Sequence, residues 1–475
     1  MVFSSSLFLF AFFPMFFITY FIVPNKLKNA VIIAGSLFFY AWGAHSFILI
    51  VIATSIVDYQ LGKVIYKTRI EKSKLYKTCI IVDLVINFGL LLYFKYTNFL
   101  FDNINNLFQI MGLNPFVFTR IVLPIGISFV VFQKVTYCLD IAKGTTQPAK
   151  AYWHFLEYLL IFPQIIAGPI VKYNDIAAQI AERTWSHKNI IEGFKRFAIG
   201  LFKKVWIADV LAKYADIAFN GPSNLIPIHY AWFGMLCYSF QIYFDFSSYS
   251  DMAIGLLKAM GFTISENFNF PYISKSITEF WKRWHISLTS WMREYLYIPL
   301  GGNRKGHLRA FFNQWIVFLI SGFWHGANWN FIIWGAYHGS LLCIEKAGLL
   351  KKTQKIPTIV RLIVTFFFVN IGWVVFRADG FYAGLEFIKQ MFNLSSVMVH
   401  TDPARIMVVD NRGIIIFFLA CFICILPFFE KQYKKLAHFS TIYTKTILIG
   451  CFLLFVLSAV KIGTGNLSPF IYFRF

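Results

Sequence analysis

The chain has 475 residues, of which 58% are hydrophobic and only 14% charged, and its formal net charge is +22. Apolar runs recur along nearly the whole chain, and a helix needs about 20 apolar residues to cross a bilayer, so the composition indicates a multi-pass membrane protein and excludes a soluble fold. The lysines and arginines cluster between these runs without forming a continuous stripe, which is typical of cytoplasmic loops and excludes nucleic-acid binding.

Residues 1–23 are expected to form the first transmembrane helix, because they lack the basic start and the cleavage motif of a signal peptide. The densest basic loop covers residues 63–77 and is expected in the cytoplasm. The other basic clusters should share that side, and both termini then lie outside it. These clusters are residues 26–28, 282–309, 346–355 and 431–445.

Because backbone that faces lipid must make its own hydrogen bonds, we expect an all-α fold, a multi-pass transmembrane helical bundle in one domain, 1–475. Two intervals between basic loops, 29–62 and 311–345, are too short for two perpendicular spans and a turn, so they predict short or re-entrant helices. His325 lies near the middle of the second interval. Since broken helices at membrane depth line protein-walled cavities, the spacing predicts a cavity around His325.

The remaining chain combines spans with one irregular stretch. Pro357–Phe376 and Gly413–Phe429 are expected to be spans joined by an extracytoplasmic connection, and Thr446–Val460 is expected to be the last span. Between residues 270 and 305, Ile277–Leu296 reads as one amphipathic helix with a tryptophan stripe, for which the simpler alternative is a helix anchored at the membrane interface.

Three groups of residues could carry chemistry. His325 is flanked by Gly322 and Gly326, and an ionisable residue in an apolar run is a functional hypothesis by default, although it could instead donate to a neighbouring helix carbonyl. His285 could transfer a proton or could be an interfacial side chain. Asp245 and Gln241 belong to the polar segment 241–251, which could serve the active site or tie helices together.

Several activities are disfavoured by missing motifs. The chain has no Walker A motif, no G-x-G-x-x-G, no H-E-x-x-H and no G-x-S-x-G, which disfavours ATP-driven transport, nicotinamide chemistry, zinc proteolysis and serine-hydrolase chemistry. Cys421 and Cys424 are spaced like a metal motif but lie within an apolar run. We therefore expect no disulfide and no metal site.

Five segments, in order along the chain, resemble the membrane-bound O-acyltransferase (MBOAT) family, and within it the bacterial alginate and peptidoglycan O-acetyltransferase-like branch. They are residues 162–170, 241–255, 281–288, 297–303 and 321–329. The resemblance implies about 11 spanning helices plus re-entrant and amphipathic segments around a central tunnel. It also implies that acetyl-CoA is the acyl-donor substrate and that no cofactor is bound permanently.

The resemblance gives roles to individual residues. His325 matches the position of the catalytic histidine and His285 the second family position, so His325 would be the general base that removes the proton of a hydroxyl acceptor. Arg283, Arg293, Arg304 and Lys305 lie on the side where a donor bearing phosphates would arrive, or they are plain topogenic charge. The residues expected to bind substrate or support the site are Asp245, Trp324, Asn328, Arg283, Arg304 and Gln241.

The C-terminal tail, 464–475, ends in an aromatic sequence that resembles a C-terminal motif of this branch. We hypothesise that Tyr472 accepts the acyl group and passes it on, the alternative being an interfacial aromatic anchor. The expected function is O-acetylation of an extracytoplasmic polysaccharide, peptidoglycan or alginate-like, from a bacterial inner membrane, with a periplasmic SGNH-like acetyltransferase as partner. D-alanyl transfer to teichoic acid and non-enzymatic transport of an acyl compound are the alternatives.

Overall fold

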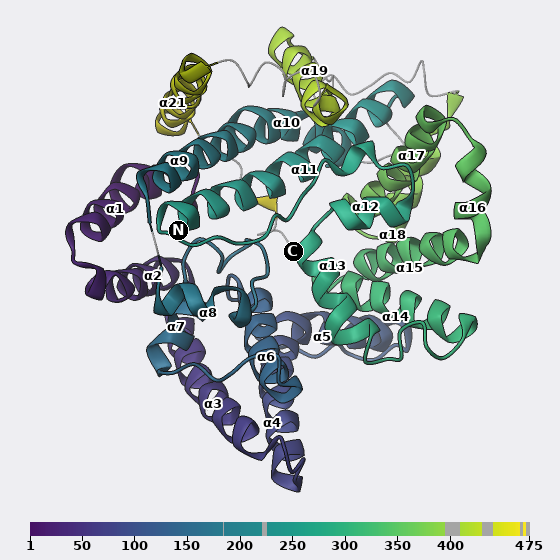
Figure 1. The fold of residues 1–475 in the computed structure, drawn as a ribbon. Helices are drawn as coiled ribbons and strands as arrows, with labels where there is room; N and C mark the ends of the chain where they lie inside the picture. Colours follow the sequence, from purple (N-terminus) through teal and green to yellow (C-terminus); the bar gives the residue numbers. More distant parts are fainter. Residues whose placement is uncertain (184, 221–225, 395–408, 430–439, 466–468, 472–475) are drawn as a thin grey trace. The chain divides into compact units, whose positions relative to one another are not determined.

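The computed structural model describes every residue except 184, 221–225, 395–408, 430–439, 466–468 and 472–475. The described residues form helices and loops, with no strand among them (Figure 1). The backbone separates into two compact units, residues 1–197 with 252–265 and residues 198–251 with 266–475. The interpretation of the whole chain as one domain stays a prediction.

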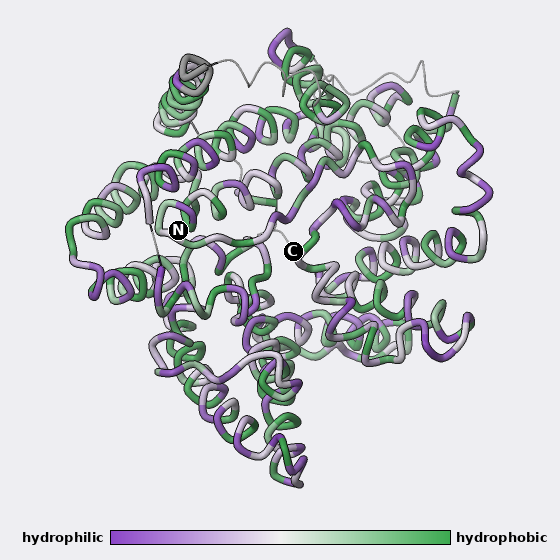
Figure 2. Tube along the Cα trace, viewed as in Figure 1, coloured by the Kyte–Doolittle hydropathy of each residue, from purple (hydrophilic) through white to green (hydrophobic). Residues whose placement is uncertain are grey.

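Six of the described helices are long and apolar enough to cross a membrane, so the protein is a multi-pass helical membrane protein. The apolar composition of these helices can be followed in Figure 2, as can the hydrophilic residues where α3 (Phe47–Thr68) joins α4 (Lys74–Leu91). The six segments are Asn25–Ala44, Phe47–Thr68, Lys74–Ile110, Thr358–Arg377, Asn411–Phe429 and Lys445–Thr464. The last three confirm the spans predicted in the C-terminal part of the chain.

The first unit is built from the N-terminal helices. Its first apolar helical segment, Phe8–Ile22, is shorter than the predicted span 1–23, mainly because it begins at Phe8. It ends before Pro24, since a residue that precedes proline is disfavoured in helical conformation. The α-helices that begin in this unit are α1 (Phe13–Ile22), α2 (Lys28–Ala44), α3 (Phe47–Thr68), α4 (Lys74–Leu91), α5 (Thr97–Ile110), α6 (Ile127–Lys143), α7 (Tyr152–Leu160), α8 (Tyr173–Ala181) and α9 (His187–Phe202).

The prediction of short or re-entrant helices was wrong for the interval 29–62. Helices α2 and α3 meet at a tight connection, residues 45–46, and α3 continues through the basic residues Lys63 and Lys67, so both helices reach spanning length. Long lysine side chains can extend along apolar surface with their charge in water, which allows a span to run into a basic loop.

A buried ion pair ties three helices of the first unit together. Lys134 Nζ of α6 lies 2.9 Å from Asp58 Oδ2 of α3, and the exposed fractions of the two side chains are 1% and 0%. Asn87 of α4 donates to Asp58 Oδ1 at 3.0 Å. Charges away from water must be paired and hydrogen-bonded, and this cluster satisfies that requirement inside the helix bundle.

The second unit holds all of the predicted site residues that the structure describes. Its core is an aromatic cluster that includes Trp281, Trp284, Trp334 and Trp373. The α-helices that begin in it are α10 (Asp209–Phe219), α11 (Ile228–Ala259), α12 (Ile277–Arg283), α13 (Ile286–Met292), α14 (His307–His325), α15 (Trp329–Ile344), α16 (Leu350–Lys352), α17 (Thr358–Arg377), α18 (Phe381–Met391), α19 (Asn411–Ile425) and α21 (Ser440–Thr464).

The predicted break near His325 is present. Helices α14 and α15, of 19 and 16 residues, lie side by side and join at residues 326–328, and neither is among the six candidate spans (Figure 1). Glycines allow the close contact: a Cβ on Gly322 would lie 2.1 Å from Phe331 O, and one on Gly335 would lie 2.2 Å from Phe318 O. Small residues at such contacts let membrane helices approach closely.

Candidate active site

The predicted single helix Ile277–Leu296 is broken at Trp284 and His285, so that prediction was wrong. Helix α12 ends at Arg283 and α13 begins at Ile286, and His285 between them has a left-handed backbone with φ 43°. A non-glycine residue rarely adopts this conformation, and it persists only where surrounding contacts hold it. The aromatic stripe continues past the break, which is why its spacing suggested one helix.

Asn267 holds the broken backbone in place. Its main-chain carbonyl accepts from Ile286 N at 2.9 Å, and its side-chain Oδ1 accepts from Ser287 N at 3.2 Å and from Ser287 Oγ at 2.9 Å. The same Oδ1 lies 3.1 Å from His285 Nδ1, while Asn267 Nδ2 donates to Ser250 Oγ at 3.2 Å. An oxygen acceptor next to Nδ1 selects the tautomer with the proton on Nδ1, which gives Nε2 the ring's lone pair.

His325 is the last residue of α14 and is 7% exposed. Aromatic rings surround its imidazole: the centroid of Trp334 lies 5.3 Å away, that of Phe376 5.5 Å and that of Trp324 5.1 Å, each in a T-shaped contact. This packing restricts the ring to one orientation. A general base needs such fixed placement, because acid–base catalysis depends on geometry before it depends on pKa.

Trp324 links the two histidines, since its ring centroid lies 6.4 Å from that of His285. His285 is 1% exposed and lies outside the six candidate spans. Burial, and to a lesser extent the neighbouring His325, lowers the pKa of His285 well below its usual value. His285 is therefore a neutral imidazole near pH 7, able to accept or pass a proton.

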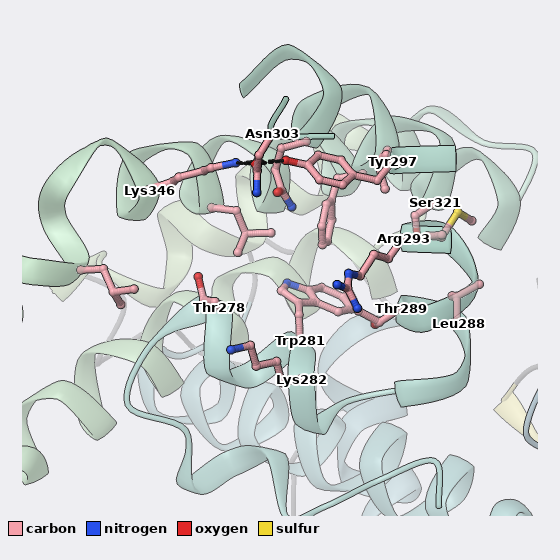
Figure 3. Close-up of a pocket in the computed structure, with 16 residues that line it drawn as sticks. Thr278, Trp281, Lys282, Leu288, Thr289, Arg293, Tyr297, Asn303, Ser321 and Lys346 are labelled. Carbon is pink, nitrogen blue, oxygen red and sulfur yellow. Dashed lines mark hydrogen bonds between the residues drawn. The ribbon is translucent and has the colours of Figure 1, made fainter. Parts of the chain in front are cut away.

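A cavity of about 430 Å³ lies between α12, α13, α14 and α15 (Figure 3). Trp281 and Ser321 are among its walls, and His325 follows Ser321 by one helical turn on α14, which places both on the same helix face. The other apolar lining residues are Leu288, Met292, Val317, Phe318, Leu342 and Leu350. Neither His325 nor His285 is among the lining residues, and Ser321 is the lining residue of α14 that is closest to His325 along the helix.

The polar lining residues give the cavity a positive charge. Lys282, Arg293 and Lys346 all line it, and none of its lining residues is acidic. Lys346 Nζ donates to Asn303 Oδ1 at 2.7 Å and to Tyr297 OH at 3.0 Å, and this group lies across the cavity from Trp281 (Figure 3). Lysine and arginine side chains in this arrangement suit a ligand that bears phosphate groups.

Glu345 fixes one wall of the cavity. Its carboxylate accepts from Ile277 N at 2.7 Å, from Thr278 N at 2.8 Å and from Thr278 Oγ1 at 2.7 Å. The two amide donors are free N–H groups at the start of α12, where a negative charge also interacts favourably with the helix dipole. Glu345 therefore anchors the helix that carries Trp281 and Lys282.

Only some of the other residues that were predicted to bind the acyl donor or support the site line the cavity. Arg293 lines the cavity, but Arg283 does not: its guanidinium pairs with Glu279 at 2.9 Å and donates to Asn269 O at 3.0 Å. Arg304 is exposed in the turn that follows Gly302 and is not a lining residue. Asn328 caps α15, where its side chain accepts from the Asn330 amide at 3.4 Å.

The predicted residues of α11 lie in a second polar region of the unit. Gln241 is buried, and its Oε1 has no hydrogen bond within the part of the chain that the structure describes. Asp245 is 2% exposed and lies 2.6 Å from Lys204 Nζ. Tyr472 lies outside the described residues, although its neighbour Ile471 is described and buried.

Sequence reasoning missed several residues of the site. Asn267 lies in a loop with no motif around it, so no local signal identified it. Lys346 was counted only as topogenic charge. Lys204 stands next to Lys203 in a segment, 197–218, that also carries Asp209, Lys213 and Asp216, so its charge did not stand out in the sequence as that of His325 did.

The second unit thus contains two buried imidazoles and, on the same helices, a cavity lined by lysine and arginine, an arrangement that would suit an enzyme in a multi-pass helical protein. The model of the membrane-bound O-acyltransferase family, MBOAT, matches residues 37–385, well over half of the chain. The chain belongs to this family and is an O-acyltransferase.

Individual relatives narrow this assignment. The chain is 37% identical over 494 aligned residues to "Probable alginate O-acetylase AlgI" of Pseudomonas putida, covering 100% of both proteins. It is 38% identical to "Peptidoglycan O-acetyltransferase" of Helicobacter pylori, over 84% of the chain and 81% of the relative. Its match to "Teichoic acid D-alanyltransferase" of Bacillus subtilis is weaker, 29% identical over 54% of the chain and 69% of the relative. The protein is therefore related to polysaccharide O-acetyltransferases.

Proposed function

We propose that this protein takes acetyl from cytoplasmic acetyl-CoA and passes it across the bacterial inner membrane for O-acetylation of an extracytoplasmic polysaccharide, alginate-like or peptidoglycan. The observation that carries the proposal is the cavity, which has three cations in its lining and approaches the helix turn of His325. The phosphates of the donor would contact Lys282, Arg293 and Lys346, and the pantetheine arm would extend along the apolar walls.

In the proposed reaction, His325 acts as the general base. The oxygen of a hydroxyl acceptor attacks the thioester carbonyl carbon while its proton passes to His325. The C–S bond then breaks, and the thiolate leaving group takes the proton back from the imidazolium, so that charge and protons balance. Such proton transfer accelerates a reaction by about 10²- to 10⁴-fold. His285, held neutral by burial, would position the reacting groups or share the proton.

Tyr472 is the proposed first acceptor. A phenol has a pKa of about 10, so an aryl ester transfers its acyl group more readily than an alkyl ester does. A periplasmic SGNH-like acetyltransferase would collect the acetyl group and transfer it to the polysaccharide. Replacing Tyr472 with Phe should abolish transfer to the polymer, and full transfer in that variant would refute the relay.

The proposed path crosses the membrane through a central tunnel in a bundle of about 11 spanning helices, with both termini outside the cytoplasm. A sided assay tests it: the full chain is reconstituted in vesicles with labelled acetyl-CoA inside and the polymer and partner enzyme outside. Label should reach the external polymer without release of free acetate as the main product. Equal labelling when acetyl-CoA is supplied only outside to uniformly oriented protein would contradict the direction.

The donor site can be tested separately. Replacing Arg293 or Lys346 with Gln should raise the KM for acetyl-CoA by about tenfold for each lost charged contact, with a smaller change in kcat. The control is Lys351→Gln, because Lys351 is exposed and does not line the cavity. Acetyl-pantetheine, which lacks the nucleotide phosphates, should be used equally well by the parent protein and the cavity variants. An unchanged KM for acetyl-CoA in both cavity variants would refute this donor site.

A further inference from the structure

A buried charge cluster lies apart from the cavity lining, where α11 meets the segment before α10. Lys204 Nζ is 2.6 Å from Asp245 Oδ1 and 2.9 Å from Asp209 Oδ1. The three side chains have exposed fractions of 2%, 2% and 8%. One lysine facing two carboxylates leaves room for a further hydrogen-bond donor, because a buried carboxylate needs every oxygen partnered.

The C-terminal tail supplies that donor. Ile471 N donates to Asp245 Oδ2 at 2.6 Å, across a sequence separation of 226 positions, and Lys204 Nζ donates to Pro469 O at 3.4 Å. The Phe470 ring lies between them, 4.6 Å from Lys204 Nζ and 5.1 Å from the Tyr249 ring centroid. The cluster therefore binds the main chain of residues 469–471 by one donor and one acceptor, and it holds one aromatic side chain.

The same segment of α11 also contacts the catalytic region. Phe246, which follows Asp245, packs in a T-shaped contact with His285 at a centroid distance of 4.6 Å. Ser250, which follows Tyr249, accepts from Asn267, the residue that holds the His285 backbone. One short stretch of helix thus contacts the tail on one side and the His285 region on another.

We propose that Lys204, Asp209 and Asp245 form a tail latch: a binding site for the main chain of residues 469–471 that fixes the register of the C-terminal tail beside the wall of the His285 site. These three are positioning residues, since they would act through the tail. The proposal rests on the proposed function in one respect, namely that the tail carries the acceptor Tyr472.

The register of the tail decides where each of its side chains lies, because residues follow one another at a fixed spacing. Consecutive Cα atoms are about 3.8 Å apart, so a slip by one residue would move every tail side chain by more than the roughly 1 Å that productive geometry tolerates. A main-chain hydrogen bond combined with a seated aromatic ring fixes register in a way that apolar contacts alone would not.

Hydrogen exchange tests the latch without reference to catalysis. In the full chain, replacement of Asp245 with Ala should speed exchange of the Ile471 amide by about tenfold or more, since it removes a charged hydrogen-bond acceptor. The matched control is Asp251→Asn, which removes a carboxylate from the same helix and breaks the pair with Lys203, 2.7 Å away, but leaves the latch intact. Unchanged exchange at Ile471 in Asp245→Ala would overturn the proposal.

Changes in the tail itself keep the ion pairs of Lys204 with both carboxylates. Ile471→Pro removes the N–H donor, and Phe470→Ala removes the seated ring. Both should lower kcat for acetyl transfer to the acceptor by about 10- to 100-fold while the KM for acetyl-CoA stays unchanged. Lys204→Arg should retain transfer better than Lys204→Met, because the guanidinium keeps the charge that bridges both carboxylates.

The two proposals fail in different ways. If the parent protein transferred no acetyl at all, the proposed function would fail, yet faster exchange in Asp245→Ala would still support the latch. If acetyl transfer were normal in Ile471→Pro and Phe470→Ala, the latch would have no role in the reaction, and the proposal would be refuted while the acyltransferase assignment stood.

Discussion

The close contact between α14 and α15 leads to a sharp prediction for Gly322→Ala. Gly322 lies three residues before His325, and the added methyl group would meet backbone atoms, with Phe331 O at 2.1 Å and Gly335 Cα at 3.2 Å. Backbone cannot rotate away as a flexible side chain can. The two helices must therefore separate or shift along each other.

The size of the effect follows from the overlap. An ordinary carbon–oxygen contact is a little over 3 Å, so the helices must move apart by about 1 Å, and overpacking of this kind costs about 1–3 kcal/mol. A misplacement of about 1 Å in an active site can lower the rate by about 100-fold. We expect a lower melting temperature together with a loss of acetyl transfer of that order.

The matched control is Gly450→Ala in α21, where an added Cβ meets nothing within 4 Å. Because alanine favours helix over glycine, this control should be neutral or slightly stabilising. Both variants are compared by thermal unfolding in detergent and by transfer of labelled acetyl. Wild-type stability and activity in Gly322→Ala would refute the inference that close helix packing positions His325.

Three further predictions concern stability and the cavity wall. Lys134→Met should destabilise the protein by about 3–5 kcal/mol, because it leaves the buried Asp58 carboxylate unpaired, and adding Asp58→Asn should restore part of the melting temperature. Burial lowers the pKa of His285, so the unfolded state takes up a proton before the folded state does as the pH falls below about 6.5. The contribution of His285 to stability is therefore fully present above that pH and falls by about 1.4 kcal/mol per pH unit below it. His285→Asn should flatten the profile of melting temperature between pH 7 and 5, and an unaltered slope would contradict the lowered pKa. Glu345→Ala should cost about 1–2 kcal/mol through loss of the α12 cap and raise the KM for acetyl-CoA, and no change in either quantity would exclude an anchoring role.

The membrane class and the break at His325 could be predicted from sequence because both depend on local quantities. Run length and hydropathy identify spans, and the distance between basic loops limits what fits between them. The same arithmetic failed for residues 29–62, because α3 extends past Gly62 into the basic loop and so gains the missing length.

The geometry around His285 could not be predicted in this way. The tryptophan spacing keeps helical periodicity across the break, so the break leaves no trace in the pattern. Its cause is Asn267, which reaches His285 and Ser287 from a separate loop. The role of Asp245 likewise depends on Lys204 and Ile471, which are distant in sequence, and long-range polar contacts have no periodic signal.

The ion pair of Arg283, by contrast, could have been predicted from the sequence. Glu279 precedes it by four residues, a spacing that places the two side chains together on a helix, so their pairing was visible in the sequence. Arg283 does not line the cavity, and a role for it in binding the donor stays a prediction. Arg293, which belonged to the same predicted group and follows the break, does line the cavity.

The most direct test of the account is the role of His325 in acyl transfer. Purified full-length protein is mixed with labelled acetyl-CoA, and loss of the thioester and appearance of acetyl on the acceptor are followed in His325→Ala and in His307→Ala, a change of an exposed histidine at the start of the same helix. The account predicts that transfer falls by about 10²-fold or more in His325→Ala and stays near the parent rate in His307→Ala. Equal transfer in the parent protein and His325→Ala would contradict it.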